Sequence, residues 1–180
     1  GKTGFYAFGD YDDFEVLASL DNFTSTVHVA GAAYAASRED FVYFASIPKS
    51  NTTVAAVTSF RAGTLIDNRF CAFFTGGLKI QNPFITTGGG APYDISEIGD
   101  VVGAAMKSSA EFGPWWVFAE KQRGLIYNAL GVVNNFGPNY SDLNNLALRQ
   151  VNAVVNKGGN LYITGNFSAQ LASSRKSFLN

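Results

Sequence analysis

At 180 residues the chain is long enough to bury the core of one domain, and it is poor in charge, with 47% apolar and only 15% charged residues. A typical globular domain has about 25% charged residues, so part of this surface is expected to be covered by partner proteins. The formal net charge is −1 and no run of Lys or Arg occurs, which excludes an electrostatic footprint for nucleic acid or for anionic membranes.

The cysteine count and the glycosylation motifs bear on where the chain is made. Cys71 is the only cysteine, so no intrachain disulfide can form. Without paired cysteines we interpret the Asn-x-Ser/Thr motifs as chance matches and expect intracellular synthesis; these motifs begin at Asn22, Asn51, Asn139 and Asn166. No apolar run reaches the roughly 18–20 residues that a membrane-spanning helix requires.

The N-terminal part predicts a short helix followed by a strand. Asp10 is a suitable N-cap for a helix that reaches Leu20, with further acidic residues in its first turn. Thr26–Ala30 reads Thr-Val-His-Val-Ala and predicts a strand. The only histidine, His28, lies between two valines of this segment. We interpret it as a hydrogen-bonded structural residue rather than a catalytic one.

Two continuous apolar runs, Phe41–Ala45 and Arg69–Phe74, predict strands that are buried on both faces. Between them a helix is expected to begin at Ser50 or Asn51 and to end at about Arg61. A buried strand, a helix and a second buried strand are typical of a parallel unit. The predicted fold class is therefore α/β with α+β features, a layered sheet flanked by helices, and residues 1–180 are expected to form a single domain.

Residues Thr75–Tyr93 depart from this pattern because glycines and prolines interrupt two short apolar pieces. We expect a loop or hairpin that leaves the core. The glycine run Gly88–Gly90 is not interpreted as a phosphate-binding loop, since Ala91-Pro92 follows it where such a loop needs a helix.

The clearest helical stripe follows Ser96 and is expected to end at Gly113-Pro114, because proline lacks an N–H and disfavours helix at the residue before it. Both tryptophans, Trp115 and Trp116, come next. Two adjacent indoles are expected to pin this linker to the body of the domain.

The remaining segments predict short strands around one helix. The helix begins at Ser141, and a last helix is expected from about Ser173, where the pattern is cut off. A glycine-containing turn at residues 156–159 joins the last two strands. The predicted strands are Gly124–Tyr127, Gly131–Val133, Ala153–Val155 and Asn160–Thr164.

The residues predict no catalytic, cofactor-binding or metal site. One histidine and one cysteine cannot assemble a thiol triad or a thiolate–imidazole zinc cluster. Asp10, Asp12 and Asp13 are similar to the start of a calcium loop, but Glu15 stands where that loop needs glycine. We interpret the three carboxylates as helix caps.

The order of segments resembles the contractile tail sheath proteins of myovirus-type bacteriophages and related injection machines. The run from Gly113 to Gly124 is similar to the family's Gly-x-Trp…Arg-Gly segment, and the run from Val151 to Gly165 is similar to its Val-Asn…Gly-x-Gly…Gly segment. Within the family, the specific expectation is the sheath of the phiKZ-type giant phages. The residues that carry the resemblance are Gly113, Pro114, Trp115, Trp116, Arg123, Gly124, Asn152, Gly159 and Gly165.

The resemblance implies a structural subunit without enzymatic activity or cofactors. Subunits of this family stack as rings around a tail tube and contract to drive the tube through the host envelope, and their terminal arms add strands to neighbours. The implied partners are other sheath subunits, tail tube and baseplate proteins, and the implied location is the virion, assembled in the host cytoplasm. The chain would be a protease-resistant fragment that lacks both arms and is monomeric alone.

Two other interpretations remain open from the residues. An α/β small-molecule or nucleotide-binding domain would hold its ligand beyond the strand ends, near Ser46–Asn51 or Thr75–Gly77, with Lys49, Ser50 and Asn51 on a phosphate. A secreted lectin-like binder would instead use the aromatic residues and the glycosylation motifs.

Overall fold

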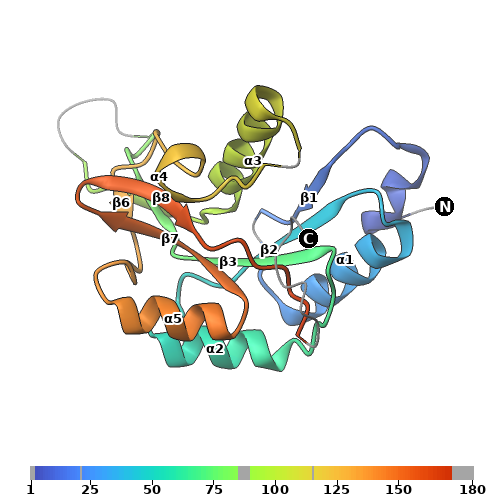
Figure 1. Ribbon diagram of the computed structural model, residues 1–180, viewed down its shortest axis with the longest axis horizontal. Coiled ribbons are helices and arrows are strands. Elements are labelled where there is room, and N and C mark those ends of the chain that lie inside the picture. The colour runs from blue at the N-terminus through green and yellow to red at the C-terminus, as the bar shows by residue number, and fades with distance from the viewer. Residues whose placement is uncertain (1–2, 21, 85–89, 115, 172–180) are drawn as a thin grey trace.

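A five-stranded sheet forms the centre of the computed structural model, which describes residues 3–20, 22–84, 90–114 and 116–171 (Figure 1). The strand order is β1-β2-β3-β7-β8; the first four strands are parallel, and β8 runs antiparallel to β7. The strands are β1 (Val16–Ala18), β2 (Val42–Ser46), β3 (Cys71–Thr75), β7 (Val151–Lys157) and β8 (Asn160–Thr164). This arrangement confirms the predicted α/β class.

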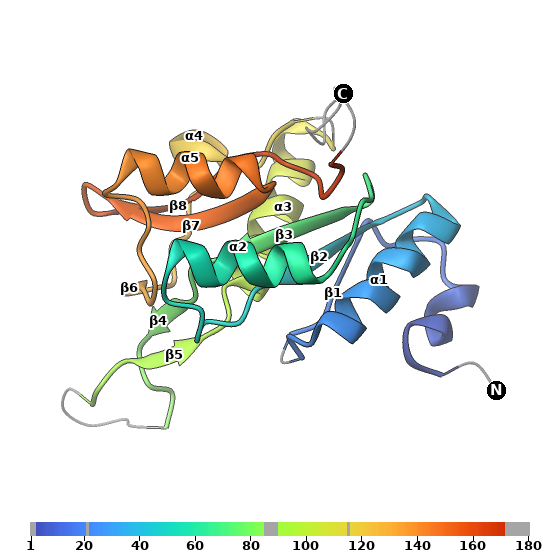
Figure 2. The same cartoon turned by 90° about the horizontal axis from the view of Figure 1, so that it is seen from below.

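Helices cover both faces of this sheet. One face carries α1 (Ser25–Arg38), α2 (Val54–Gly63) and α5 (Tyr140–Leu148), and the other carries α3 (Ile98–Phe112), as Figure 2 shows from below. Side chains alternate between the faces along each strand, so that Tyr43 points to the first face. Its neighbour Phe44 points to the second. Both faces of β2 and β3 are therefore buried, as their continuous apolar runs predict.

The region before β2 differs from the sequence-based expectation. Residues 4–10 form a 3-10 helix, β1 occupies part of the predicted first helix, and the predicted strand Thr26–Ala30 lies inside α1. The buried positions of α1 include His28, Gly31 and Ala35, a helical spacing that places one stripe on the sheet. A Cβ on Gly31 would lie 2.5 Å from the Tyr43 ring, so glycine permits the close approach of helix and sheet. Tertiary packing thus overrides the local β-propensity.

Arg38, the last residue of α1, binds the 3-10 helix region to the domain. This helix, Gly4–Asp10, has no buried residue of its own. The Arg38 guanidinium donates to the Phe8 carbonyl and to the Tyr11 carbonyl, each at 2.8 Å. The same group is paired with Asp40. The contact is polar and lies at the rim of the fold.

Replacing Arg38 by alanine is expected to make residues 4–12 more susceptible to proteolysis while changing the global free energy of unfolding little, because ion pairs at the surface contribute little to global stability. Limited proteolysis followed by mass spectrometry measures the first effect. Arg69→Ala is the matched control, since the Arg69 side chain is 61% exposed and its Nη2 lies 3.8 Å from the Glu39 Oε1. Equal cleavage rates in the two variants would contradict this role of Arg38.

A second, three-stranded antiparallel sheet stands at the carboxyl ends of β2 and β3, in the order β5-β4-β6. Its strands are β4 (Leu78–Ile80), β5 (Tyr93–Ile95) and β6 (Gly131–Val132). β4 and β5 extend away from the body of the domain (Figure 2). Of the predicted excursion Thr75–Tyr93, the first residue ends β3, β4 follows it, and Tyr93 begins β5; Gly88 and Gly89 lie outside the described residues.

The C-terminal third contains one wrong prediction, whereas the predicted strand at Gly131 and the predicted helix at Ser141 are confirmed as β6 and α5. Instead of a strand at Gly124–Tyr127, the short helix α4 (Glu120–Arg123) leads to a single bridge between Leu125 and Tyr162. The predicted β7–β8 hairpin is confirmed, and its turn glycine Gly159 has a φ of 80°, which favours glycine. The expected helix from Ser173 lies outside the described residues. Among the described helices, none is long and apolar enough to cross a membrane.

Candidate functional site

The segment after α3 brings several family-like residues into contact. Gly113 ends α3 with a φ of 98°, and its N–H donates to the Ser109 carbonyl at 2.9 Å. The Arg123 guanidinium lies 4.3 Å from the centre of the Trp116 ring and 5.3 Å from that of Phe112. The contact closes the loop between α3 and α4. Trp115, which carries part of the same resemblance, lies outside the described residues.

Gly124 lets this loop reach the edge of the main sheet. A Cβ at Gly124 would lie 2.9 Å from the Ala119 Cα, so a larger residue would force the backbone apart. The Gly124 carbonyl accepts from the Ile163 N–H, and the Ile126 N–H donates to the Leu161 carbonyl, both at 2.9 Å. These bonds cover part of the outer edge of β8.

Asn152 on β7 lies beside Gly165, the residue that follows β8. The Asn152 amide donates to the Phe73 carbonyl at 3.1 Å and to the Phe167 carbonyl at 2.9 Å, and its oxygen accepts from the Phe167 N–H at 2.9 Å. Gly165 has a φ of 81°, and a Cβ there would lie 2.9 Å from the Asn152 Oδ1. A buried side chain thus fastens the segment after β8 to the sheet centre.

In the region where a nucleotide-binding interpretation places its ligand, several polar groups bind other groups of the chain. Glu97, the residue before α3, is fully buried; its carboxylate accepts from the Ser46 hydroxyl at 2.8 Å and from the Gly77 N–H at 2.9 Å. The Lys49 ammonium donates to the Asp94 carbonyl. Ser46, Gly77 and Lys49 therefore bind other groups of the chain, whereas the buried Thr75 hydroxyl at the end of β3 has no hydrogen-bond partner among the described residues.

The sheet topology also lacks the feature that forms ligand crevices in open α/β sheets. Such crevices form where the strand order reverses direction, between strands whose connecting helices leave to opposite faces. Here β1, β2, β3 and β7 follow one another in one direction, and the first two crossover helices, α1 and α2, cover the same face. Among the described residues, no three His, Cys, Asp or Glu side chains gather as a metal site.

His28 is a buried structural residue, as its sequence context indicates. Its Nδ1 lies 3.1 Å from the Tyr43 hydroxyl and its Nε2 lies 2.9 Å from the Ser46 carbonyl. Burial lowers the pKa of His28 below its ordinary value, so that the neutral ring is favoured. The histidine therefore connects α1 to β2.

A buried arginine, Arg61, was not predicted from the sequence. Its guanidinium donates to the carbonyls of Ile66 and Ala169 at 2.9 and 2.8 Å and lies 4.6 Å from the centre of the Phe73 ring. Burial lowers its pKa. The single sequence signal is its spacing: Arg61 follows Val57 by four residues, on the helix face that turns inward.

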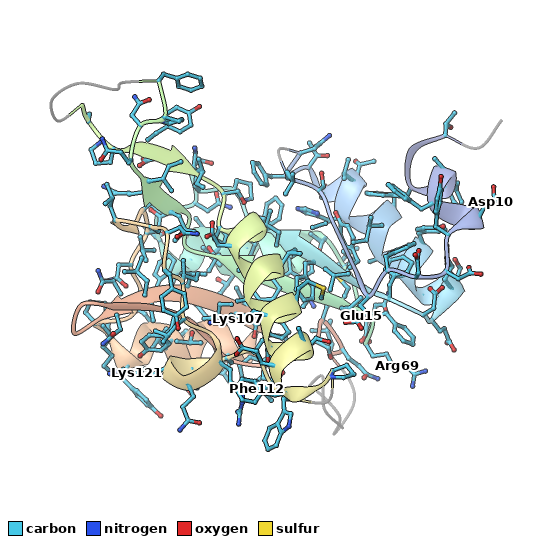
Figure 3. All side chains as sticks on the ribbon, turned by 90° about the horizontal axis from the view of Figure 1, so that it is seen from above. Asp10, Glu15, Arg69, Lys107, Phe112 and Lys121 are labelled. Carbon is cyan, nitrogen blue, oxygen red and sulfur yellow. The ribbon has the colours of Figure 1, made fainter. Side chains whose placement is uncertain are left out.

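A concave, mostly apolar surface lies beside the edge strand β1. A cavity of about 290 Å³ opens between β1, β2, α3 and the segment after Gly113. Glu15 stands at its rim and accepts from the Ser109 hydroxyl of α3 at 3.1 Å, and Figure 3 labels Glu15 beside this helix. The apolar lining of the cavity includes Val16, Val42, Phe44, Met106, Trp116 and Phe118.

The comparisons with known proteins identify the fold. No protein-family model matches the sequence, and no curated protein matches it. Among solved structures, the chain is similar to a chain in the cryo-EM structure of the anti-feeding prophage (AFP) baseplate, with a TM-score of 0.73 and 14% identity over 96% of this chain. It is also similar to a chain of the AFP helical sheath in the contracted state, with a TM-score of 0.71 and 13% identity.

A third similar structure is the contracted sheath complex of PVC, an extracellular contractile injection system, with a TM-score of 0.69 and 13% identity. The two sheath matches also cover 96% of this chain. The chain spans less than half of each matched protein, namely 42%, 43% and 44%. The domain therefore has the fold of one part of the chains that build these contractile assemblies.

Proposed function

We propose that the chain is a domain of a sheath subunit from a contractile injection machine of the phage-tail type. The observation that carries the proposal is the fold likeness over 96% of the chain to chains in two sheath structures and one baseplate structure. The proposed role is structural, and in support of it the buried side chains of Glu97, Asn152 and Arg61 bind other elements of the domain. The phiKZ-type origin stays a prediction from the sequence.

The proposed partners are copies of the same subunit, together with tail tube and baseplate proteins, in a particle assembled inside a bacterial host. The low fraction of charged residues supports a surface that proteins cover. Large exposed side chains such as Phe84, Tyr140 and Leu148 fit the same role. The proposal includes no cofactor, no nucleic acid and no direct membrane contact.

We further propose that assembly needs segments outside these 180 residues. The matched proteins are more than twice as long as the part to which this chain corresponds. Strand addition between subunits needs an extended segment that reaches a neighbour. The chain alone is then expected to remain monomeric.

Electron microscopy of the full-length parent beside this chain tests both parts of the proposal. Tubes or stacked rings are expected from the parent, and dispersed single particles from the chain at matched concentration and ionic strength. Analytical ultracentrifugation of the chain checks its monomeric state. Dispersed particles from the parent under all conditions would count against the sheath assignment, and tubes from the chain alone would refute the need for further segments.

A further inference from the structure

Glu97 stands at the joint between the two sheets, and its environment goes beyond what a structural role requires. One carboxylate oxygen accepts from Ser46 at the end of β2, and the other accepts from the Gly77 N–H between β3 and β4. Glu97 also directly precedes α3. A single buried carboxyl group therefore connects the main sheet, the small sheet and the helix that covers them.

A chain of hydroxyl groups leads from this carboxyl group toward the surface. The Ser46 Oγ lies 2.8 Å from Glu97 Oε1 and 3.0 Å from the Ser96 Oγ, and either serine can be the donor in the second contact. Ser46 is buried, whereas Ser96 is half-buried. Serine hydroxyls donate and accept by rotating, so this chain can run in either direction.

The two directions correspond to the two protonation states of Glu97. With the carboxylate charged, Ser96 donates to Ser46 and Ser46 donates to Glu97. With the carboxyl neutral, Glu97 donates its proton to Ser46 and Ser46 donates to Ser96. Deprotonation moves one proton from Glu97 to Ser46, one from Ser46 to Ser96 and one from Ser96 to water, so that charge and atoms balance.

We propose that Glu97 changes its protonation state inside the folded domain, exchanging its proton with solvent through Ser46 and Ser96, and so strengthens or weakens the joint between the two sheets. The charged form holds the Gly77 N–H by a charge-assisted hydrogen bond, and the neutral form holds it less strongly. The inference concerns regulation of the domain itself and does not depend on the proposed function.

Burial acts on this equilibrium in a known direction. It raises the pKa of Glu97 above its ordinary value of 4.5, and the hydrogen bonds from the backbone of Glu97 itself, from Ser46 and from Gly77 only partly oppose it. Between 4.5 and the raised value the folded chain binds more protons than the unfolded chain. Stability therefore falls as pH rises through this window, while the Glu97–Gly77 bond becomes stronger.

Few charged groups are available to compete with this effect. Burial alone is the cause that raises the pKa of Glu97, and no neighbouring charge contributes. The neutral ring of His28 reaches the Ser46 carbonyl from the other face of the sheet. The ionisable side chains on the elements packed around the joint are Tyr43 on β2, Lys49 after β2, Cys71 on β3, Lys79 on β4, Tyr93 and Asp94 on β5, and Asp100, Lys107 and Glu111 on α3.

The Gly77 amide signal in a nuclear magnetic resonance pH titration of this chain tests the proposal. A sigmoidal shift with a midpoint above 4.5 is expected in the unaltered chain, and Glu97→Gln is expected to abolish it. Asp100→Asn is the matched control, since Asp100 lies on the first turn of α3 and burial raises its pKa as well. This control variant should keep the Gly77 titration.

Ser96→Ala tests the relay separately, because it removes the hydroxyl nearest to solvent and leaves Glu97 in place. We expect slower proton exchange, seen as a Gly77 signal that broadens or splits near the midpoint. A signal as sharp as in the unaltered chain would overturn the relay. A Gly77 shift that stays constant from pH 4 to 9 in the folded chain would overturn the whole proposal. If Glu97→Gln does not fold, the side-chain carboxyl ¹³C signal of Glu97 in the unaltered chain decides the same question.

Discussion

Replacing Phe74 by alanine is expected to lower the free energy of unfolding by about 3–5 kcal/mol, the usual cost of removing a buried phenylalanine. Phe74 is 1% exposed at the carboxyl end of β3. Its ring centre lies 4.9 Å from that of Phe44 and 6.4 Å from that of Phe118. Because Phe118 belongs to the segment between α3 and α4, the substitution leaves a cavity between the sheet and this segment.

Urea denaturation followed by tryptophan fluorescence measures the effect of Phe74→Ala. Phe84→Ala is the matched control, since it removes the same atoms from a side chain that is 81% exposed, and it should change stability by about 0.5 kcal/mol or less. If the two variants lose the same stability, Phe74 does not lie in the core as described.

Asn152→Ala is expected to lower the free energy of unfolding by about 2–4 kcal/mol. The substitution removes three hydrogen bonds, each with a net contribution of about 1 kcal/mol, and leaves the Phe73 carbonyl and the backbone of Phe167 without these partners. The segment after β8 should then detach before the sheet unfolds. Hydrogen exchange is expected to show earlier exchange at residues 165–171 than in the unaltered chain.

Asn156→Ala, in the same strand, provides the control for Asn152. The hydrogen bonds of Asn156 to Asn135 use its backbone N–H and carbonyl, which alanine keeps. We expect this variant to retain stability within about 0.5 kcal/mol. Comparable losses in Asn152→Ala and Asn156→Ala would show that the side-chain amide of Asn152 does not hold the segment.

The buried strands were predictable because they carry their own signal. Phe41–Ala45 and, after Arg69, the run 70–74 are apolar, which is typical of strands covered on both faces, and β2 and β3 are such strands. The β7–β8 hairpin was predictable from the pair Gly158-Gly159, because glycine readily adopts the positive φ that a tight turn needs. Both glycines have positive φ in the structure. These features depend on residues that are neighbours in the sequence, and part of the resemblance to sheath proteins, the run from Val151 to Gly165, covers the same hairpin.

The segments that were predicted wrongly have local signals that tertiary packing outweighs. Thr26–Ala30 has the β-branched alternation of a strand, yet α1 forms because His28, Gly31 and Ala35 fit the face of the main sheet. Gly124–Tyr127 follows the edge of β8 through a few backbone bonds without becoming a strand. The β-propensity of a segment depends only on its own residues, whereas the structure that the segment adopts also depends on the part of the domain against which it packs.

The sequence by itself determined the α/β class, the central strands and the β7–β8 hairpin, because each follows from apolar runs and turn residues that lie within a few residues of one another. Only the tertiary structure decided that Glu97 and Arg61 are buried and which groups they bind. Glu97 meets a serine 51 residues away and a glycine N–H 20 residues away, and Arg61 meets a carbonyl 108 residues away. Whether a polar side chain is buried, and which groups it binds, depends on segments that are distant in the sequence. These segments come together only when the sheet has formed.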